Sequence, residues 1–198
     1  MTEPVSQVQA RPGSWLAFFR GFLKSPKGVG SVIPSSRFME RAIIQYARPE
    51  SEQVVVELGP GTGGTTRALL GAMRDDARLL AIDLDPAFTA IVSAIPDPRL
   101  IAHTGSAADL VDILGQYQLD SAGVVVSGIP FSTMPRPVAE AVIDAVHAAL
   151  RPGGAFVAYQ FRSEVARVAE PVFGPAVRTE KVVLNVPPMR IWRWEKQA

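Results

Sequence analysis

The feature that most restricts the fold is an apolar strand that runs directly into a glycine-rich turn. Residues 54–58 (VVVEL) have a composition typical of a β-strand, and residues 59–64 (GPGTGG) follow at once. Glycine allows the backbone angles of a tight strand-to-helix turn and lets a ligand approach the main chain closely. The pattern predicts a strand–loop–helix unit that binds a ligand at the loop.

Strands and helices alternate along the rest of the chain. Apolar runs bounded by Gly and Pro predict further strands over residues 78–82, 100–103, 124–126 and 155–161. Helices are expected over residues 37–47, 64–73, 86–94, 107–117 and 137–150. Residues 181–185 and 190–194 flank a Pro-Pro pair and are expected to form a closing antiparallel hairpin. The order predicts a Rossmann-like α/β fold with a mostly parallel, seven-stranded sheet.

Composition excludes several kinds of site. The 198 residues include no Cys and two His, which excludes a disulfide framework and thiolate metal ligands and leaves no basis for a metal centre. A net charge of +1, from 20 basic and 19 acidic residues, gives no reason to expect a general nucleic-acid binder. We find neither a secretory signal nor an apolar run of the ~18 residues that span a bilayer, so the expected location is cytoplasmic.

The charge is unevenly distributed along the chain. Residues 4–39 hold five basic and no acidic side chains, whereas residues 40–198 hold 15 basic and 18 acidic ones. A helix expected over residues 15–24 is amphipathic, which is typical of a helix in a membrane interface but also of one packed on a core. Its membrane-binding candidates are Trp15, Phe18, Phe19, Arg20, Phe22 and Lys24. We expect residues 1–50 to form membrane-binding or lid helices and residues 51–198 to form one domain.

The glycine loop favours a cofactor with a positive centre. Glu57 lies two residues before the first glycine, where its carboxylate would repel a diphosphate, and Pro60 removes one amide donor. S-adenosylmethionine carries a sulfonium and an ammonium, which suit that carboxylate. Asp83, at the end of the second strand, is placed to accept hydrogen bonds from the two ribose hydroxyls. The residues therefore predict S-adenosylmethionine as the cofactor.

Residues 57–63 (ELGPGTG) resemble motif I of the class I S-adenosylmethionine-dependent methyltransferases, and Asp83 resembles their strand-two acid. Ser106 departs from the family pattern, because many members have aspartate there to meet the adenine amino group. The resemblance implies a cofactor site made of Glu57, Gly59, Gly61, Gly63, Asp83, Leu84, Ser106, Ala107 and Ser127.

A narrower resemblance covers nearly the whole chain. The segments that carry it, besides motif I, are FLKSP (22–26), VIPSS (32–36), SGIP (127–130) and NVPPMRIW (185–192). They are similar to bacterial phospholipid N-methyltransferases of the peripheral-membrane type. The resemblance implies successive methylation of the phosphatidylethanolamine amine towards phosphatidylcholine, with release of S-adenosyl-L-homocysteine. It implies a phospholipid substrate and an anionic membrane surface on the cytoplasmic face as partners, and no nucleic acid. We expect a monomer.

The catalytic candidates lie after the fourth strand and at the end of the fifth. Tyr159 is expected to orient the amine through its hydroxyl or its ring, and the backbone carbonyls of Ser127 and Gly128 are further candidates. A lipid phosphate needs a cation, for which Arg37 and Arg190 are our choices. The full set of substrate candidates is Ser35, Ser36, Arg37, Tyr46 and Arg190.

Two other functions remain open. An rRNA adenine N6-dimethyltransferase would share the layout, but such enzymes carry Asn-Leu-Pro-Tyr where this chain has residues 128–131 (GIPF). Gly128 has no side-chain acceptor for an adenine amino group, and residues 40–198 are acidic, which suits RNA poorly. The second alternative is a non-catalytic S-adenosylmethionine-binding membrane module.

Overall fold

The computed structural model describes residues 36–185 and 187–197. The expected helix over residues 15–24 and Ser35 lie outside the described residues. The chain divides into two compact units, Met1–Val32 and Ile33–Ala198, and the second unit is the one described below.

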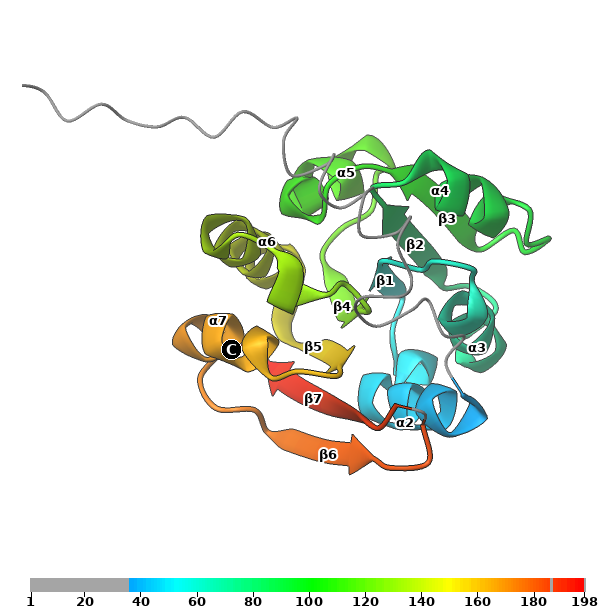
Figure 1. Ribbon diagram of the computed structural model, residues 1–198. Helices are drawn as coiled ribbons and strands as arrows, with labels where there is room; N and C mark the ends of the chain where they lie inside the picture. The colour runs from blue at the N-terminus through cyan, green and yellow to red at the C-terminus, as the bar shows by residue number, and fades with distance from the viewer. Residues whose placement is uncertain (1–35, 186, 198) are drawn as a thin grey trace, which may run out of the picture. The chain divides into compact units, whose positions relative to one another are not determined.

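One seven-stranded sheet organises this unit (Figure 1), with the strand order β3-β2-β1-β4-β5-β7-β6. The first five strands are parallel, and β7 runs antiparallel to both β5 and β6. The strands are β1 Val54–Leu58, β2 Arg78–Asp83, β3 Leu100–Thr104, β4 Ala122–Ser127, β5 Leu150–Gln160, β6 Arg178–Val182 and β7 Met189–Glu195. The predicted fold class is confirmed.

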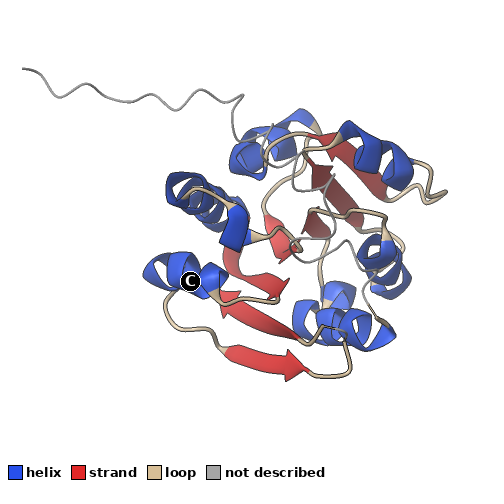
Figure 2. Ribbon diagram, in the orientation of Figure 1, coloured by secondary structure: helices blue, strands red, loops and turns tan. Residues whose placement is uncertain are grey.

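Helices cover both faces of the sheet (Figure 2). Their bounds are α2 Arg37–Ala47, α3 Gly64–Ala72, α4 Pro86–Ser93, α5 Leu110–Gln116, α6 Arg136–Ala149 and α7 Glu164–Phe173, with short 3₁₀ turns η1 Pro49–Ser51, η2 Ala107–Asp109 and η3 Phe131–Thr133. Apolar residues of α5, α6 and α7 share one core cluster with the sheet, and those of α2 and α3 share another. The parallel strands are therefore covered on both sides, which explains their nearly unbroken apolar sequences.

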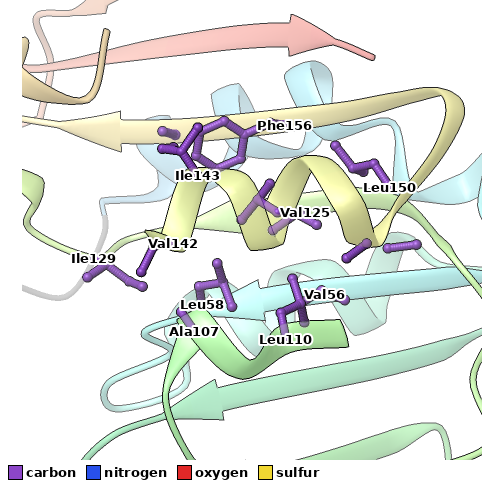
Figure 3. Packing of buried hydrophobic residues seen from close by; sticks show 14 of the residues in the cluster. Val56, Leu58, Ala107, Leu110, Val125, Ile129, Val142, Ile143, Leu150 and Phe156 are labelled. Atoms are coloured by element: carbon purple, nitrogen blue, oxygen red, sulfur yellow. The ribbon is translucent and has the colours of Figure 1, made fainter. Parts of the chain in front are cut away.

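The core on the α5–α6–α7 side packs aliphatic residues around Phe156 (Figure 3). The Phe156 ring stacks on Phe173 and on Trp194, with ring centroids 5.8 and 5.4 Å apart. Strand β1 alternates between the clusters, because Val56 and Leu58 belong to this one and Val55 to the other. Glu57 shares the face of Val55, so its carboxylate lies under α3.

Helix α2 is built into the same unit as the sheet, although the sequence analysis grouped it with the N-terminal helices. The Ser36 side chain caps its N-terminus by accepting from the amide of Met39. The helix buries one apolar face against the strands and ends at Arg48, which is left-handed with φ 51°. The Arg193 guanidinium of β7 donates to the carbonyl of Tyr46 and ties the helix end to the sheet.

Two elements differ from expectation in the second half of the chain. Strand β5 begins at Leu150 rather than Ala155, because Leu150 pairs with Ala122 across a register shift in β4. Helix α7, which the sequence analysis did not predict, carries Pro171 inside it and buries Val165, Ala169 and Phe173 against the sheet side. Because proline is unfavourable inside a helix, a ten-residue segment that contains one is not predicted as helical.

The predicted strand over residues 181–185 is wrong in its bounds. Strand β6 pairs with β7 only as far as Val182, opposite Met189, so residues 183–185 and 187–188 belong to the hairpin tip. Val183 and Leu184, which lay within that predicted strand, have 63% and 62% of their surface exposed. The apolar run is thus at the surface.

Phe156 and Phe161 offer a test of the core, because one is fully buried and the other is 63% exposed just after the same strand. We expect Phe156→Ala to lower the free energy of unfolding by about 3–5 kcal/mol, since it removes a buried ring and leaves a cavity. Phe161→Ala is the matched control and should stay within about 0.5 kcal/mol of the parent. Chemical denaturation measures both, and equal losses would contradict the packing described.

Candidate active site

The site lies where the sheet order reverses, between β1 and β4. Strand β1 lies between β2 and β4, so the chain continues from β1 to its neighbour on one side and later adds β4 on the other side. In α/β sheets, such a reversal of strand order forms a crevice at the carboxyl ends of the two strands. The amide of Gly59 donates to Ile82, and the amide of Gly128 donates to Leu58, each at 2.9 Å. These bonds fix the two loops that follow β1 and β4 side by side.

The glycine loop needs glycine for its backbone shape. Gly59, Gly61 and Gly63 have φ values of 75°, 54° and 82°, in the left-handed region that side chains disfavour. A Cβ on Gly59 would also lie 3.3 Å from the Ile129 side chain of the neighbouring loop. The loop leads into α3, so free helix-terminal amides lie at this edge. Such amides suit the carboxylate of an amino-acid ligand.

Glu57 is a buried acid, and only one of its two carboxylate oxygens has a hydrogen-bond partner among the described residues. Its Oε2 accepts a 2.6 Å hydrogen bond from the Thr66 hydroxyl, while Oε1 has no partner among the described residues. Burial raises the pKa of Glu57 to about 7, against the lowering effect of the Thr66 bond and with a further rise from Asp83. A buried carboxylate with a spare acceptor fits a cationic group of a ligand, and S-adenosylmethionine carries two.

Asp83 joins the glycine loop to the end of β2. Its Oδ2 accepts from the amide of Gly61 at 3.4 Å and its Oδ1 from the amide of Asp85 at 2.9 Å. Burial raises the pKa of Asp83, which these backbone bonds partly oppose. Its neighbour Leu84 is half-buried at the same edge. Asp83 is thus where a ribose-binding acid would stand.

The residues after β3 reach the same edge. The amide of Gly105 donates to the Asp83 carbonyl at 2.9 Å, which places Ser106 and Ala107 beside β2. The Ser106 hydroxyl accepts from the amide of Ala108 at 3.2 Å and caps the turn η2, and Ala107 is buried. The Ser106 hydroxyl is therefore engaged within the fold as the cap of η2.

Tyr159 stands over Gly128. The Tyr159 hydroxyl lies 3.3 Å from the Thr65 hydroxyl at the start of α3. A Cβ at position 128 would lie 2.6 Å from that same phenol oxygen, so only glycine leaves room for it. The space that a side chain at position 128 would fill is instead occupied by the tyrosine hydroxyl. All three catalytic candidates, Tyr159, Ser127 and Gly128, meet here.

Buried polar contacts hold the loop after β4. The buried Ser127 hydroxyl accepts from the amide of Ile129 at 3.3 Å, and the Gln160 amide donates to the carbonyl of Ile129 at 2.5 Å. Gln160 is the last residue of β5 and is itself buried. The backbone of residues 127–129 is therefore fixed from two sides.

Asn185 joins two of the sequence segments that carry the narrower resemblance, residues 32–36 and 185–192. Its Oδ1 accepts from the amide of Ser36 at 3.2 Å, and its Nδ2 donates to the carbonyl of Pro187 at 2.8 Å. Arg190 pairs opposite Gln160 in the sheet, so it lies near the same edge, and Arg37 is exposed one residue after Ser36. Ser36, Arg37 and Arg190 thus gather around the carboxyl ends of the strands.

Tyr46 is not brought to this edge. Its hydroxyl lies 3.5 Å from a carboxylate oxygen of Glu180, and the Arg178 guanidinium covers its ring at 4.2 Å. Both partners belong to β6, with Arg178 at the end away from the hairpin tip and Glu180 in the middle of the strand. The structure gives the Tyr46 side chain contacts inside the fold rather than beside the glycine loop.

Four side chains that shape the site were not predicted from the sequence: Thr65, Thr66, Gln160 and Asn185. Two hydroxyls in the first turn after a glycine loop, and a polar residue ending an apolar strand, are signals that would have found the first three. Asn185 was visible only as part of the Asn-x-Pro-Pro segment. Its hydrogen bond to Ser36 spans 149 residues of sequence, which no local pattern shows.

Within residues 36–185 and 187–197, no group of three or more His, Asp or Glu side chains is placed to hold a metal ion. No helix in the described part of the chain is both long and apolar enough to cross a bilayer.

Glu57→Gln tests the role of the buried acid. A raised pKa means that folding favours the neutral carboxyl, so the stability of the ligand-free protein falls as pH rises from the ordinary 4.5 to about 7. The carboxylate then costs on the order of 3 kcal/mol above pH 7. At pH 8 we expect Glu57→Gln to unfold at higher denaturant concentration than the parent, yet to bind S-adenosylmethionine about tenfold or more weakly.

The parent protein should also lose affinity for S-adenosylmethionine as pH falls below about 7, whereas Glu57→Gln should not show this step. Calorimetric titration and denaturation over a pH series measure both effects. Glu140→Gln is the control, because the Glu140 side chain on α6 is 46% exposed. Unchanged affinity in Glu57→Gln would contradict a contact between the Glu57 carboxylate and a cationic group of the cofactor.

Comparison with known proteins agrees with this geometry. Residues 55–154, which run from β1 into β5, match the family described as "Methyltransferase domain". An ornithine lipid N-methyltransferase from Singulisphaera acidiphila is 30% identical over 141 residues, which are 70% of this chain and 73% of that protein. A ribosomal RNA small subunit methyltransferase H from Aromatoleum aromaticum is 41% identical, but over only 63 residues, 30% of this chain and 20% of that protein.

Solved structures share the fold at low sequence identity. A 1,6-didemethyltoxoflavin-N1-methyltransferase from Burkholderia thailandensis, with bound S-adenosylhomocysteine, superposes with a TM-score of 0.67 at 18% identity, over 98% of this chain and 94% of that one. The N-methyltransferase NodS from Bradyrhizobium japonicum WM9 gives 0.64 at 14% identity, over 82% and 89%. The chain belongs to the class I S-adenosylmethionine-dependent methyltransferases, which take a methyl group from S-adenosyl-L-methionine and release S-adenosyl-L-homocysteine.

Proposed function

We propose that this methyltransferase acts on the amine of a membrane lipid, converting phosphatidylethanolamine through its mono- and dimethyl derivatives to phosphatidylcholine. The observation that carries the proposal is the pairing of Gly128 with the Tyr159 hydroxyl beside the glycine loop. At this place the acceptor amine would meet the ring and hydroxyl of Tyr159. The rRNA adenine N6-dimethyltransferases have an asparagine side-chain amide at the position of Gly128 instead. The 30% identity to an ornithine lipid N-methyltransferase supports a lipid amine as the acceptor.

The residues at the crevice are suited to position an amine. A primary amine is largely protonated at neutral pH, and it must lose one proton before its nitrogen can accept the methyl group that S-adenosylmethionine supplies. The Tyr159 ring attracts the ammonium form, while its hydroxyl and the carbonyls of Ser127 and Gly128 offer hydrogen-bond acceptors. Most of the rate gain then comes from holding the two reactants in line.

The lipid phosphate is assigned to cations at the same edge. Arg190 lies opposite Gln160, next to Tyr159 in β5, and Arg37 follows the Ser36 cap that Asn185 holds. Both arginines are exposed. A guanidinium can take two phosphate oxygens at once, which fixes the headgroup relative to the crevice.

Binding to the cytoplasmic face of the membrane completes the proposal. The helix expected over residues 15–24 is the proposed anchor, with its aromatic residues in the interface and Arg20 and Lys24 toward anionic headgroups. These residues lie outside the described part of the chain. The enzyme is proposed to act as a monomer and without nucleic acid.

An ornithine lipid is the second candidate substrate, favoured by the relative of that name. It too presents an amine on a membrane lipid, so the same crevice chemistry applies. The difference lies at the headgroup anion, because phosphatidylethanolamine carries a phosphate. A guanidinium pairs with a phosphate or with a carboxylate such as that of ornithine, so Arg37 and Arg190 fit either lipid, and methyl transfer to each lipid decides between them.

Transfer of a radiolabelled methyl group distinguishes these substrates. Vesicles contain phosphatidylethanolamine, its monomethyl or dimethyl derivative, or an ornithine lipid, each with and without ribosomal RNA as competitor. We expect label in the three phospholipids, with phosphatidylethanolamine yielding all successive products, and no loss of rate with RNA. Label only in the ornithine lipid assigns the second substrate, label in RNA assigns an RNA methyltransferase, and no label at all contradicts lipid methylation.

A double-mutant cycle tests the Tyr159–Gly128 pair. We expect Tyr159→Phe to lower kcat about 10- to 100-fold with the affinity for S-adenosylmethionine little changed, because it removes one hydroxyl at the acceptor side. Gly128→Ala should cost a similar factor, since its methyl group displaces that hydroxyl. The double variant should be no slower than the slower single one, because both act through one atom.

Two controls match these variants. Tyr117→Phe removes a hydroxyl that lies 3.0 Å from His103, and Gly115→Ala adds a Cβ with no atom within 4 Å. Both lie at or near the end of α5 and should leave kcat unchanged. Fully multiplicative losses in the double variant would contradict the shared-hydroxyl account.

A further inference from the structure

Exposed apolar side chains gather at the sheet edge that holds the active site. Phe161 follows β5 directly, and Val183 and Leu184 form the tip of the β6–β7 hairpin, each with 62–63% of its surface exposed. Phe38, in the first turn of α2, is 38% exposed. Exposed apolar residues that cluster in this way usually mark an interaction surface.

Strand register and one buried hydrogen bond bring these segments together. Gln160 pairs with Arg190, which puts Phe161 beside the start of β7, and Val182 pairs with Met189 at the base of the hairpin tip. Asn185, inside the tip, accepts a hydrogen bond from the amide of Ser36, next to Arg37 and Phe38. Tyr159 pairs with Ile191 one residue further into the sheet. The apolar residues therefore rim the crevice.

The charge of these segments has one sign. Residues 36–39, 161–163 and 181–190 hold four basic side chains, Arg37, Arg162, Lys181 and Arg190, all exposed, and no acidic one. By contrast, residues 40–198 as a whole have 18 acidic and 15 basic residues. Apolar side chains among cations match the interface of an anionic bilayer, where the former enter the headgroup boundary and the latter meet lipid charge.

We propose that Phe161, Val183, Leu184 and the four basic residues form a membrane-docking surface, here called the hairpin patch. It is separate from the helix expected over residues 15–24 and rests on the proposed lipid substrate. Docking through the patch turns the Tyr159 crevice toward the bilayer, so that a headgroup reaches it with little displacement from the membrane. An anionic bilayer is the occupant, because the patch has four cations and no acid.

The hairpin patch is tested in the full chain with a matched pair of variants. Val183→Asp/Leu184→Asp places two negative charges at the tip of β6. Val177→Asp is the control, because Val177 is 58% exposed just before the other end of the same strand. Neither position belongs to the catalytic or cofactor residues.

Sedimentation with vesicles of phosphatidylcholine and phosphatidylglycerol measures docking without any reaction. We expect Val183→Asp/Leu184→Asp to bind these vesicles about tenfold or more weakly, and Val177→Asp to stay within about twofold of the parent. Vesicles of pure phosphatidylcholine should bind all three proteins weakly. Affinity for S-adenosylmethionine and the melting temperature should be unchanged. Phe161→Ser, made alone, provides a second variant if the double one unfolds.

Activity separates failure of the patch from failure of the proposed function. With lipid in vesicles the double variant should be slow, whereas with dispersed short-chain phosphatidylethanolamine it should match the parent. If the parent methylates lipid but the variants bind vesicles as tightly as it does, the patch is overturned and the function stands. If no lipid is methylated but the double variant loses vesicle binding, the docking surface stands without the substrate. A parent that dimerises through these residues, shown by light scattering, also overturns the patch.

Discussion

The close approach of the loops after β1 and β4 is the constraint on which the active site depends. Gly59 and Gly128 meet there, and a Cβ on the first would contact Ile129, while a Cβ on the second would collide with the Tyr159 hydroxyl. Backbone hydrogen bonds from both glycines to neighbouring strands hold the approach in place. The absence of two side chains lets the glycine loop, the loop after β4 and Tyr159 share one small region.

A buried acid under that loop links stability to function. Glu57 lies between sheet and α3, with one oxygen bound by Thr66 and the other without a partner among the described residues. Burial raises its pKa to about 7, so the ligand-free fold carries the cost of a desolvated carboxylate at higher pH. A cationic group of a bound ligand offsets this cost. The Glu57 carboxylate thus lowers the stability of the ligand-free protein but favours binding of a cationic ligand.

The sequence predicted the parts of the site that depend on local pattern. The strand at residues 54–58, the glycine turn and Asp83 follow from apolar runs and glycine spacing, and the structure brings them together. The hydrogen bond between Asn185 and Ser36 could not be predicted from local sequence patterns, because it joins segments that are distant in the sequence. The end of the strand predicted over residues 181–185 was misplaced, because Val183 and Leu184 continue its apolar run although they are exposed. Pattern analysis assumes that apolar residues are buried, and these two are not.

The central claim is that the methyl group is transferred to the nitrogen of a membrane lipid. Mass spectrometry and fragmentation of lipids recovered from vesicles, after incubation with the purified full chain and isotopically labelled S-adenosylmethionine, test it most directly. The account predicts labelled methyl groups on the headgroup nitrogen of phosphatidylethanolamine, accumulating one at a time. Methyl groups found elsewhere, or recovered only in added RNA, would contradict it.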